Sequence, residues 1–186
     1  PVLLFGISVF LLGSIGAGLA WSMQSLIAFR FIQGFGAGAI TPVAMTIVGD
    51  IYTKEERAKV QGYISSVWGI SAILGPALGG VLIEYVSWSW IFWINLPIGL
   101  LSAGGLLFFY HEHRKVEKQK IDYRGSLLLT VSLSLLMFLL VDGGTAFSWL
   151  SLTSLLIILS ILILLIIFVK QQNKASEPIM PFTIWN

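Results

Sequence analysis

Apolar side chains occupy this chain in long runs, and most polar and charged side chains lie in the short stretches between them. A helix rises about 1.5 Å per residue, so about 20 apolar residues cross a bilayer core of about 30 Å. Six runs reach or approach that length, and the fifth is the shortest: Val2–Trp21, Leu26–Val48, Gln61–Ile83, Ile91–Tyr110, Gly125–Val141 and Leu152–Val169. The pattern therefore predicts an all-α membrane protein with six transmembrane helices.

Composition agrees with this prediction. Of the 186 residues, 56% are hydrophobic and 11% are charged, whereas about a quarter of the residues in a soluble domain are charged. The chain has no cysteine, which excludes disulfides and thiol chemistry. Its formal net charge of +2 gives no reason to expect a nucleic-acid partner, so the expected surroundings are the lipid bilayer. Because no basic leader precedes the first run, we interpret the chain as a fragment and do not interpret that run as a signal peptide.

Basic residues predict which side of the membrane each loop faces, because cytoplasmic loops are enriched in Lys and Arg. All but one of the 11 basic residues lie after the second run, after the fourth run or in the C-terminal tail: Lys54, Arg57, Lys59, Arg114, Lys115, Lys118, Lys120, Arg124, Lys170 and Lys174. The intervening loops contain none. We therefore predict a multi-pass protein of the inner or plasma membrane, with both ends of the chain in the cytoplasm.

Tryptophan marks the opposite, outer ends of the runs, at Trp21, Trp88, Trp90 and Trp149. Indole prefers the headgroup boundary, where its ring is half buried and its N–H stays hydrated. The alternative is that Trp88, Trp90 and Trp93 stack on a ligand.

Glycine distinguishes the first four runs, which are rich in Gly and Ala, from the last two, in which Leu127–Val141 and Leu155–Val169 contain no glycine. Small residues let helices approach closely in lipid, where no hydrophobic force drives their association. We expect the first four helices to pack against other protein. The last two fit a lipid-facing position at the edge of a bundle, or the core of another bundle.

The third run carries one stripe of small residues near i, i+4, i+7 spacing: Gly62, Ser66, Gly69, Ala72, Pro76, Gly79 and Gly80. Gly75-Pro76 lies in the middle of the run, and a proline there removes a backbone hydrogen bond and bends the helix. The stripe predicts tight packing, or a contact that seals in one conformation and releases in another.

Arg30 is the one charged residue inside any run, about one turn below the outer end of the second. Burying an arginine at the middle of a membrane helix costs about 2.5–3.5 kcal/mol on insertion scales. The side chain could extend to the headgroups. Gln33 lies one turn deeper on nearly the same face and is followed by Gly34, which suggests instead a water-filled cavity. There Arg30 would hold an anion or favour the ionised form of a carboxylic acid.

The chain has no acidic residue in the middle of a run, so a proton-carrying acid is expected outside this fragment. Asp50 is expected to pair with Arg57 or Lys59 and to steady the cytoplasmic loop. His111 and His113 form a His-x-His pair, for which a solvated loop is favoured over a metal site, so no metal is predicted. No nucleophile–base set, phosphate-binding loop or zinc spacing is present, so we predict no enzyme activity and no cofactor beyond the proton as coupling ion.

Three motifs resemble the Major Facilitator Superfamily, specifically its fourteen-span drug:proton antiporters of the EmrB/QacA type. The second run resembles the family motif that carries an arginine implicated in proton coupling: Leu26, Arg30, Gln33, Gly34, Gly36 and Ala37. The third run resembles the antiporter motif, thought to seal the cavity against ion leak, with serine in place of one glycine: Gly62, Ser71, Gly75, Pro76, Gly79 and Gly80. The stretches Trp88–Phe92 and Asn95–Gly99 resemble the entry to the sixth helix, with Ser89 where relatives often have a basic residue.

The resemblance implies that the six helices are helices three to eight of fourteen. It implies four helices of the N-terminal transporter half in 1–110, a cytoplasmic basic loop in 111–124, two peripheral linker helices in 125–170, and a cytoplasmic segment leading to the C-terminal half in 171–186. The remaining helices of the same transporter would then be its protein partner, and a small molecule its substrate.

The leading hypothesis for function is proton-coupled export of lipophilic or cationic drugs by alternating access. Alternatives are a facilitator that exports a metabolite, an amino acid or a siderophore, and a non-transporting membrane scaffold, which leaves Arg30 unexplained. The membrane domain of an ATP-driven exporter would need helices that reach far into the cytoplasm, and these loops are too short to supply them.

Overall fold

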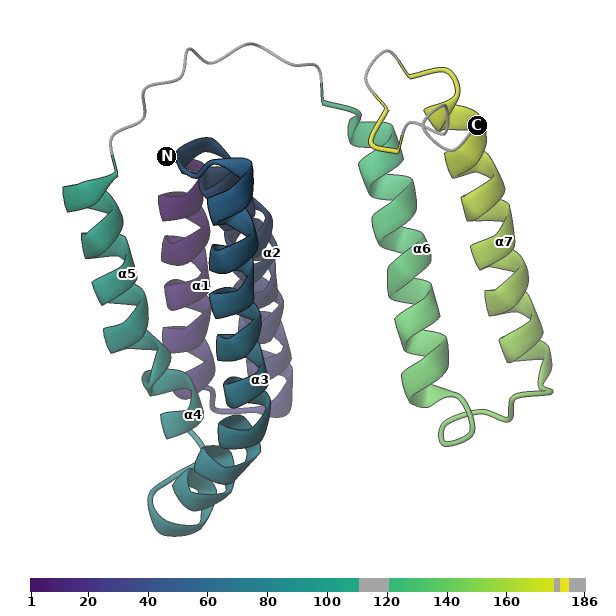
Figure 1. Ribbon diagram of the computed structural model, residues 1–186. Coiled ribbons are helices and arrows are strands. Elements are labelled where there is room, and N and C mark those ends of the chain that lie inside the picture. The colour runs from purple at the N-terminus through teal and green to yellow at the C-terminus, as the bar shows by residue number, and fades with distance from the viewer. Residues whose placement is uncertain (111–120, 176–177, 181–186) are drawn as a thin grey trace. The chain divides into compact units, whose positions relative to one another are not determined.

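The computed structural model describes residues 1–110, 121–175 and 178–180, and every named element in these ranges is a helix (Figure 1). The chain divides into two compact units, of which the first holds α1 to α5 and the second holds α6 and α7. The helices are α1 (Val2–Gly18), α2 (Met23–Ile51), α3 (Lys54–Tyr85), α4 (Trp90–Trp93), α5 (Asn95–Phe109), α6 (Tyr123–Asp142) and α7 (Leu152–Gln172).

The predicted all-α membrane architecture is confirmed. Among the described residues, 5 helical segments are long and apolar enough to cross a membrane, with α4 and α5 together forming the segment Trp90–Phe109. The first predicted span is shorter than expected, because α1 has 17 residues and ends at Gly18. The fourth is interrupted at Ile94, between the end of α4 at Trp93 and the start of α5 at Asn95. Pro97 has no N–H to donate to the carbonyl of Trp93, so the helical ladder lacks one bond there.

Two helices begin earlier than the apolar pattern predicts, because hydroxyl side chains cap them. The Ser25 N–H donates to Ser22 Oγ (3.1 Å) and the Ser22 N–H donates to Ser25 Oγ (3.0 Å), which starts α2. Thr53 and Glu56 form the same reciprocal arrangement at the start of α3. A capping box satisfies N–H groups that have no partner within the helix. The first turns of α3 therefore carry the charged residues that the sequence alone assigns to a loop.

In the first unit, α1 lies between α2 and α5 and makes most of the contacts. Three of its side chains are buried and pack against partly buried side chains of both neighbours: Leu3, Ile7 and Leu11 of α1, Ile40, Val43 and Ile47 of α2, and Ala103 and Leu106 of α5. In a bilayer such contacts stabilise through close van der Waals packing, since lipid is as apolar as the side chains.

Glycine sets the distance between α1 and α2. A Cβ on Gly36 would lie 2.7 Å from the Gly6 carbonyl oxygen, and one on Gly13 would lie 2.6 Å from the Gln33 Cα. Neither position admits a larger residue unless the backbones move apart. The expectation that the glycine-rich helices pack closely therefore holds for this pair.

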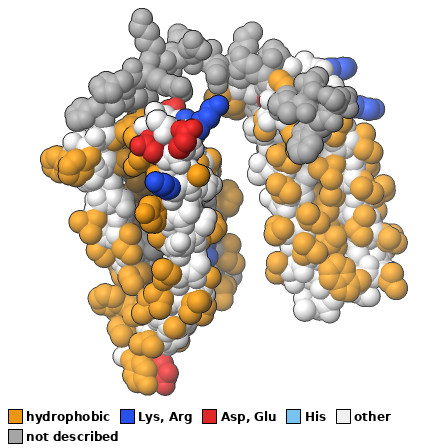
Figure 2. Space-filling view, in the orientation of Figure 1, with side chains coloured by type: hydrophobic (Ala, Val, Ile, Leu, Met, Phe, Trp, Pro, Cys, Tyr) orange, Lys and Arg blue, Asp and Glu red, His pale blue; other side chains and the backbone are white. Residues whose placement is uncertain are grey.

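The small-residue stripe of α3 faces open space within the described part of the chain. A Cβ added at any glycine of α3, within the stripe or beside it, would meet no atom within 4 Å: Gly62, Gly69, Gly75, Gly79 and Gly80. The helix has no buried residue and makes only limited contacts with α2 and α4. Hydrophobic side chains alternate with exposed backbone on its visible surface, and charged side chains gather near its start (Figure 2). The predicted sealing contact has no counterpart in this unit, so it stays a prediction.

In the second unit, a hydrogen bond joins α6 to α7 at one end, and at the other end α7 binds the loop that follows α6. Asp122 accepts from the Gly125 N–H (2.9 Å) and from Gln172 Nε2 (2.6 Å), which links the start of α6 to the end of α7. At the other end, Ser154 Oγ donates to the Ser148 carbonyl oxygen (2.7 Å). The peripheral position predicted for these helices, and the domain limits predicted for the chain, remain predictions. His111 and His113 lie outside the described residues, as does most of the predicted basic loop.

Candidate functional site

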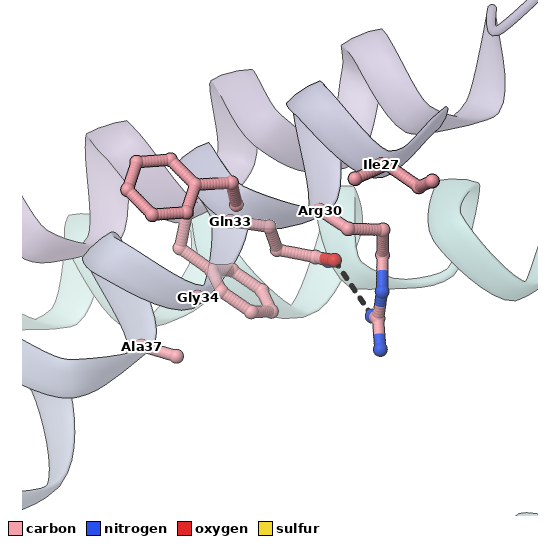
Figure 3. Close-up of a pocket in the computed structure, with 7 residues that line it drawn as sticks. Ile27, Arg30, Gln33, Gly34 and Ala37 are labelled. Carbon is pink, nitrogen blue, oxygen red and sulfur yellow. Dashed lines mark hydrogen bonds between the residues drawn. The ribbon is translucent and has the colours of Figure 1, made fainter. Parts of the chain in front are cut away.

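Two polar side chains on α2 lie one turn apart and bind each other. The Arg30 guanidinium donates from Nη1 to Gln33 Oε1 over 2.9 Å, and the two side chains point toward one another (Figure 3). Residues at i and i+3 of a helix are neighbours on its surface, so the spacing seen in the sequence leads directly to this contact. Arg30 is exposed, whereas Gln33 is only 3% exposed.

The Gln33 amide is in turn held by a second helix and lies close to a third. Its Nε2 donates to Ser14 Oγ of α1 over 2.5 Å. Asn95 Nδ2, at the start of α5, donates to the same oxygen over 3.4 Å. Ser14 is fully buried, and within the described ranges every buried side-chain nitrogen and oxygen has a hydrogen-bond partner. Buried polar networks that are fully satisfied in this way fix the positions of their members.

An aromatic ring also contacts the guanidinium. Arg30 Cζ lies 5.8 Å from the centroid of the Phe92 ring of α4, within the range of a cation–π interaction. Phe92 is buried and makes an edge contact with Trp88 at 6.1 Å between centroids. The arginine is therefore positioned from α2 and α4 together.

Arg30 and Gln33 line one open pocket of about 530 Å³ on the first unit (Figure 3). Its other walls are apolar or small: Phe10, Ile27, Phe31, Gly34 and Ala37. Gly34 has no atom within 4 Å of where a Cβ would lie, so a side chain there would project into free space. The three residues predicted to face a cavity, Arg30, Gln33 and Gly34, thus lie around the same pocket.

The chemistry of this pocket is that of one cation among apolar groups. A guanidinium is always charged and only donates hydrogen bonds, so its natural partner is a carboxylate or another anion. The helices α1, α4 and α5 contain no titratable side chain, and on α2 the other one is Asp50. On α3 the titratable groups lie in Lys54–Tyr63 and at Glu84 and Tyr85. None of these helices places an acid in the middle of a predicted span.

Among the predicted loop residues, Arg57 binds backbone carbonyl groups. Arg57 Nε donates to the Tyr52 carbonyl oxygen (3.0 Å), and its Nη2 donates to the Gly49 carbonyl oxygen. Arg57 therefore caps the last turn of α2, where basic side chains favour the negative end of the helix dipole. Asp50 and Lys59 are exposed at the same junction of α2 and α3. Arg57 thus binds backbone at this junction, a contact that charge pairing in the sequence does not reveal. The pairing of Asp50 with Arg57 or Lys59 stays a prediction.

Sequence reasoning missed Ser14 and Asn95. Serine is common in apolar helices, and Ser8 and Ser102 simply donate to a carbonyl of their own helix. The signal available in the sequence was the position of Ser14 between Gly13 and Gly16, because glycines lack the side chain that would hold a neighbouring helix at a distance. Among the described residues, no three His, Cys, Asp or Glu side chains lie close enough to hold a metal ion.

Comparison with known proteins identifies the family. The family model of the Major Facilitator Superfamily matches residues 1–182. The chain is 42% identical over 179 residues to Multidrug resistance protein 3 of Bacillus subtilis, which covers 96% of the chain and 35% of that protein. It is 32% identical to the multidrug transporter protein MdtP of Bacillus subtilis, over 97% of the chain and 33% of that protein. It is 34% identical to the multidrug efflux pump SdrM of Staphylococcus aureus, over 100% of the chain and 41% of that protein.

The chain thus spans between a third and two-fifths of the length of these relatives. Its matched region includes the whole of the Arg30 pocket, the whole first compact unit and helices α6 and α7 of the second. On this evidence the chain is a multi-pass membrane segment that belongs to the Major Facilitator Superfamily.

Proposed function

We propose that this chain forms part of a proton-coupled exporter of lipophilic or cationic drugs, which works by alternating access between two halves. The observation that carries the proposal is the Arg30 guanidinium, bound to Gln33 and Phe92 at the edge of an apolar pocket. An isolated charge is expensive inside a membrane, and it is retained where it serves a substrate or ion pathway. The relatives named as multidrug transporters support the choice of substrate class.

The pocket suggests which of its side chains bind the drug and which take part in proton coupling. Phe10, Ile27 and Phe31 offer apolar surface to a lipophilic compound, and such surfaces accept varied shapes. Arg30 would favour the ionised form of a carboxyl supplied by the rest of the transporter. Protonation of that carboxyl would release its pairing with Arg30, so that binding of the drug and binding of the proton alternate.

The orientation follows from the basic loops. We place the junction of α2 and α3 and the end of α7 in the cytoplasm, because their Lys and Arg residues follow the positive-inside rule. The outer side then holds the turn between α1 and α2, where Trp21 is 80% exposed. In the same proposal, the open small-residue stripe of α3 packs against another part of the intact transporter and closes the cavity to ions.

The experiment is drug transport by the intact transporter, purified and reconstituted in liposomes with an imposed pH gradient. The Arg30→Ala variant should lose pH-driven transport of ethidium by about a hundredfold or more, since it removes both the charge and its fixed geometry. Arg30→Lys keeps the charge but not the planar fork and should retain only part of the rate.

Matched controls separate coupling from folding. Each variant should keep the wild-type elution profile in detergent and the wild-type thermal midpoint within a few degrees. Normal pH-driven transport by Arg30→Ala would rule out the coupling role. Transport of amino acids or other metabolites, with no transport of lipophilic cations, would instead assign the chain to a metabolite exporter.

A further inference from the structure

Ser14 lies at the point where α1, α2 and α5 meet, and two amide groups donate to its single oxygen. Gln33 Nε2 is 2.5 Å away and Asn95 Nδ2 is 3.4 Å away. Ser14 has no exposed surface, so water does not replace either contact. Both contacts connect residues far apart in the sequence, which fixes the side chains through the packing of three helices.

The direction of each hydrogen bond follows from the arginine. A guanidinium has no acceptor, so Gln33 must present its oxygen to Arg30. The NH₂ of Gln33 then points away from Arg30 and needs an acceptor, which the Ser14 hydroxyl oxygen supplies. If that acceptor were absent, the buried NH₂ would be unsatisfied, and the amide would gain by rotating or shifting.

We infer that Ser14 and Asn95 are positioning residues: Ser14 holds the Gln33 amide so that its oxygen fixes the Arg30 guanidinium in the pocket, and Asn95 binds Ser14. The hydrogen bonds themselves do not depend on the proposed function. The inference rests on that function only for the role in transport that we give to the fixed guanidinium. The close contact of α1 with α2 makes the arrangement possible, because Gly13 lets the backbone of Gln33 approach next to Ser14.

The other groups near Arg30 do not substitute for this network. Its described contacts are with Gln33 and Phe92, and neither residue titrates. No titratable side chain lies on α1, α4 or α5, and Asp50 lies at the far end of α2. On α3, which contacts α2 and α4, the titratable groups lie at Lys54–Tyr63, Glu84 and Tyr85. A change in the pH dependence of transport on altering Ser14 would therefore act through Gln33 and Arg30.

The test uses the intact transporter in liposomes and measures ethidium transport as a function of pH. Ser14→Ala should lower kcat/KM by about tenfold, the effect expected when a buried amide loses its acceptor. The pH of half-maximal transport should rise, because a guanidinium that is no longer fixed favours the ionised carboxyl less. Ser14→Cys keeps the size of the side chain with a much weaker acceptor and should shift the profile in the same direction. Asn95→Ala should give a smaller shift of the same sign.

A double-mutant cycle distinguishes positioning from a general loss of packing. In a Gln33→Ala background, Ser14→Ala should cause no further shift in the pH profile, because the group through which it acts is gone. The matched control is Ser8→Ala on the same helix, where the exposed hydroxyl donates only to the Leu4 carbonyl oxygen. That variant should keep the wild-type profile.

Two results would overturn the inference. One is a wild-type pH profile in the Ser14→Cys and Asn95→Ala variants, and the other is a Ser14→Ala effect that simply adds to that of Gln33→Ala. Neither result touches the proposed function, which fails instead if Arg30→Ala keeps pH-driven transport. If Ser14→Ala does not accumulate in the membrane, Ser14→Cys and Asn95→Ala decide the matter by the same measurement.

Discussion

Two glycines at the contact of α1 with α2, Gly13 and Gly36, have surroundings opposite to those of the α3 glycines in the same unit. At Gly13 and Gly36 an added Cβ would overlap the backbone of the neighbouring helix. At Gly75 and Gly79, an added Cβ would meet nothing within 4 Å. The first pair forms a completed contact between two helices, whereas the α3 stripe is a smooth surface without a partner among the described residues. Glycine content alone therefore does not show whether a membrane helix packs against another helix of the same unit.

The same contrast appears within α2, and it gives the prediction with the largest effect on folding. Gly36→Leu should prevent stable folding or lower the free energy of unfolding by about 3 kcal/mol, because the side chain overlaps Phe10 and Gly6 of α1. Gly38→Leu on the same helix should be tolerated, since its Cβ has open space and leucine favours helix. Thermal unfolding of the intact protein in detergent measures both. Equal loss of stability in the two variants would mean that α1 and α2 do not pack as described.

A second prediction tests whether the α3 stripe serves transport and not the stability of this unit. Gly79→Leu should leave insertion and thermal midpoint nearly unchanged in detergent but lower ethidium export by about tenfold, the size expected for overpacking a contact needed during transport. Ala77→Leu places the same side chain at a position on another side of α3 and should keep most of the export. Full export by Gly79→Leu would mean that the stripe has no partner in the working protein.

The smallest expected effect concerns the second unit. There, side-chain hydrogen bonds stabilise the helices, whereas in the first unit close contacts at glycine do so. The pKa of Asp122 is lowered, chiefly by the Gly125 N–H that donates to its carboxylate and further by Gln172, while burial opposes the shift. Because the folded form has the lower pKa, the stabilisation is complete above the usual value of 3.8 and is lost as the pH falls below it. The thermal midpoint should therefore decrease in acid.

Asp122→Asn removes this ionisation and is the matched comparison for the acid experiment. The difference in thermal midpoint between wild type and variant should be present near neutral pH and should shrink below pH 3.8. Other carboxylates titrate in both proteins and cancel in the difference. A difference that stays constant with pH would show that the Asp122 carboxylate does not gain its stability from these hydrogen bonds.

The sequence predicted the helices well because burial in lipid imposes a strong and simple pattern. A run of about 20 apolar residues has few alternatives to a helix, since every backbone group must be satisfied within the segment. The boundaries were less accurate where a capping side chain decided them, as at Ser22 and Thr53. The interruption at the end of α4 also escaped the apolar pattern, because Pro97 lies inside the fourth run and removes a single backbone hydrogen bond there.

The candidate site likewise contains some residues that the sequence reveals and others that only the structure reveals. Arg30, Gln33 and Gly34 stand out in the sequence because charge and amide groups are rare in an apolar run, and they lie around one pocket. Ser14 and Asn95 do not stand out, because serine and asparagine near helix ends are common and satisfy themselves locally in most positions. Their importance depends on which oxygen and which amide come within hydrogen-bond distance across three helices.

The sequence by itself determined the membrane location, the approximate limits of most helices, the family, and the isolated arginine, because each of these follows from local composition and spacing. The tertiary structure decided which glycines contact a neighbouring helix and which lie on an open surface. It also decided which buried hydroxyl holds the amide that binds Arg30. The physical reason is distance. Each helix must by itself be long and apolar enough to cross the bilayer, and its own sequence shows this. Van der Waals contacts and hydrogen bonds act within a few ångströms, and only the packing of helices brings those groups together.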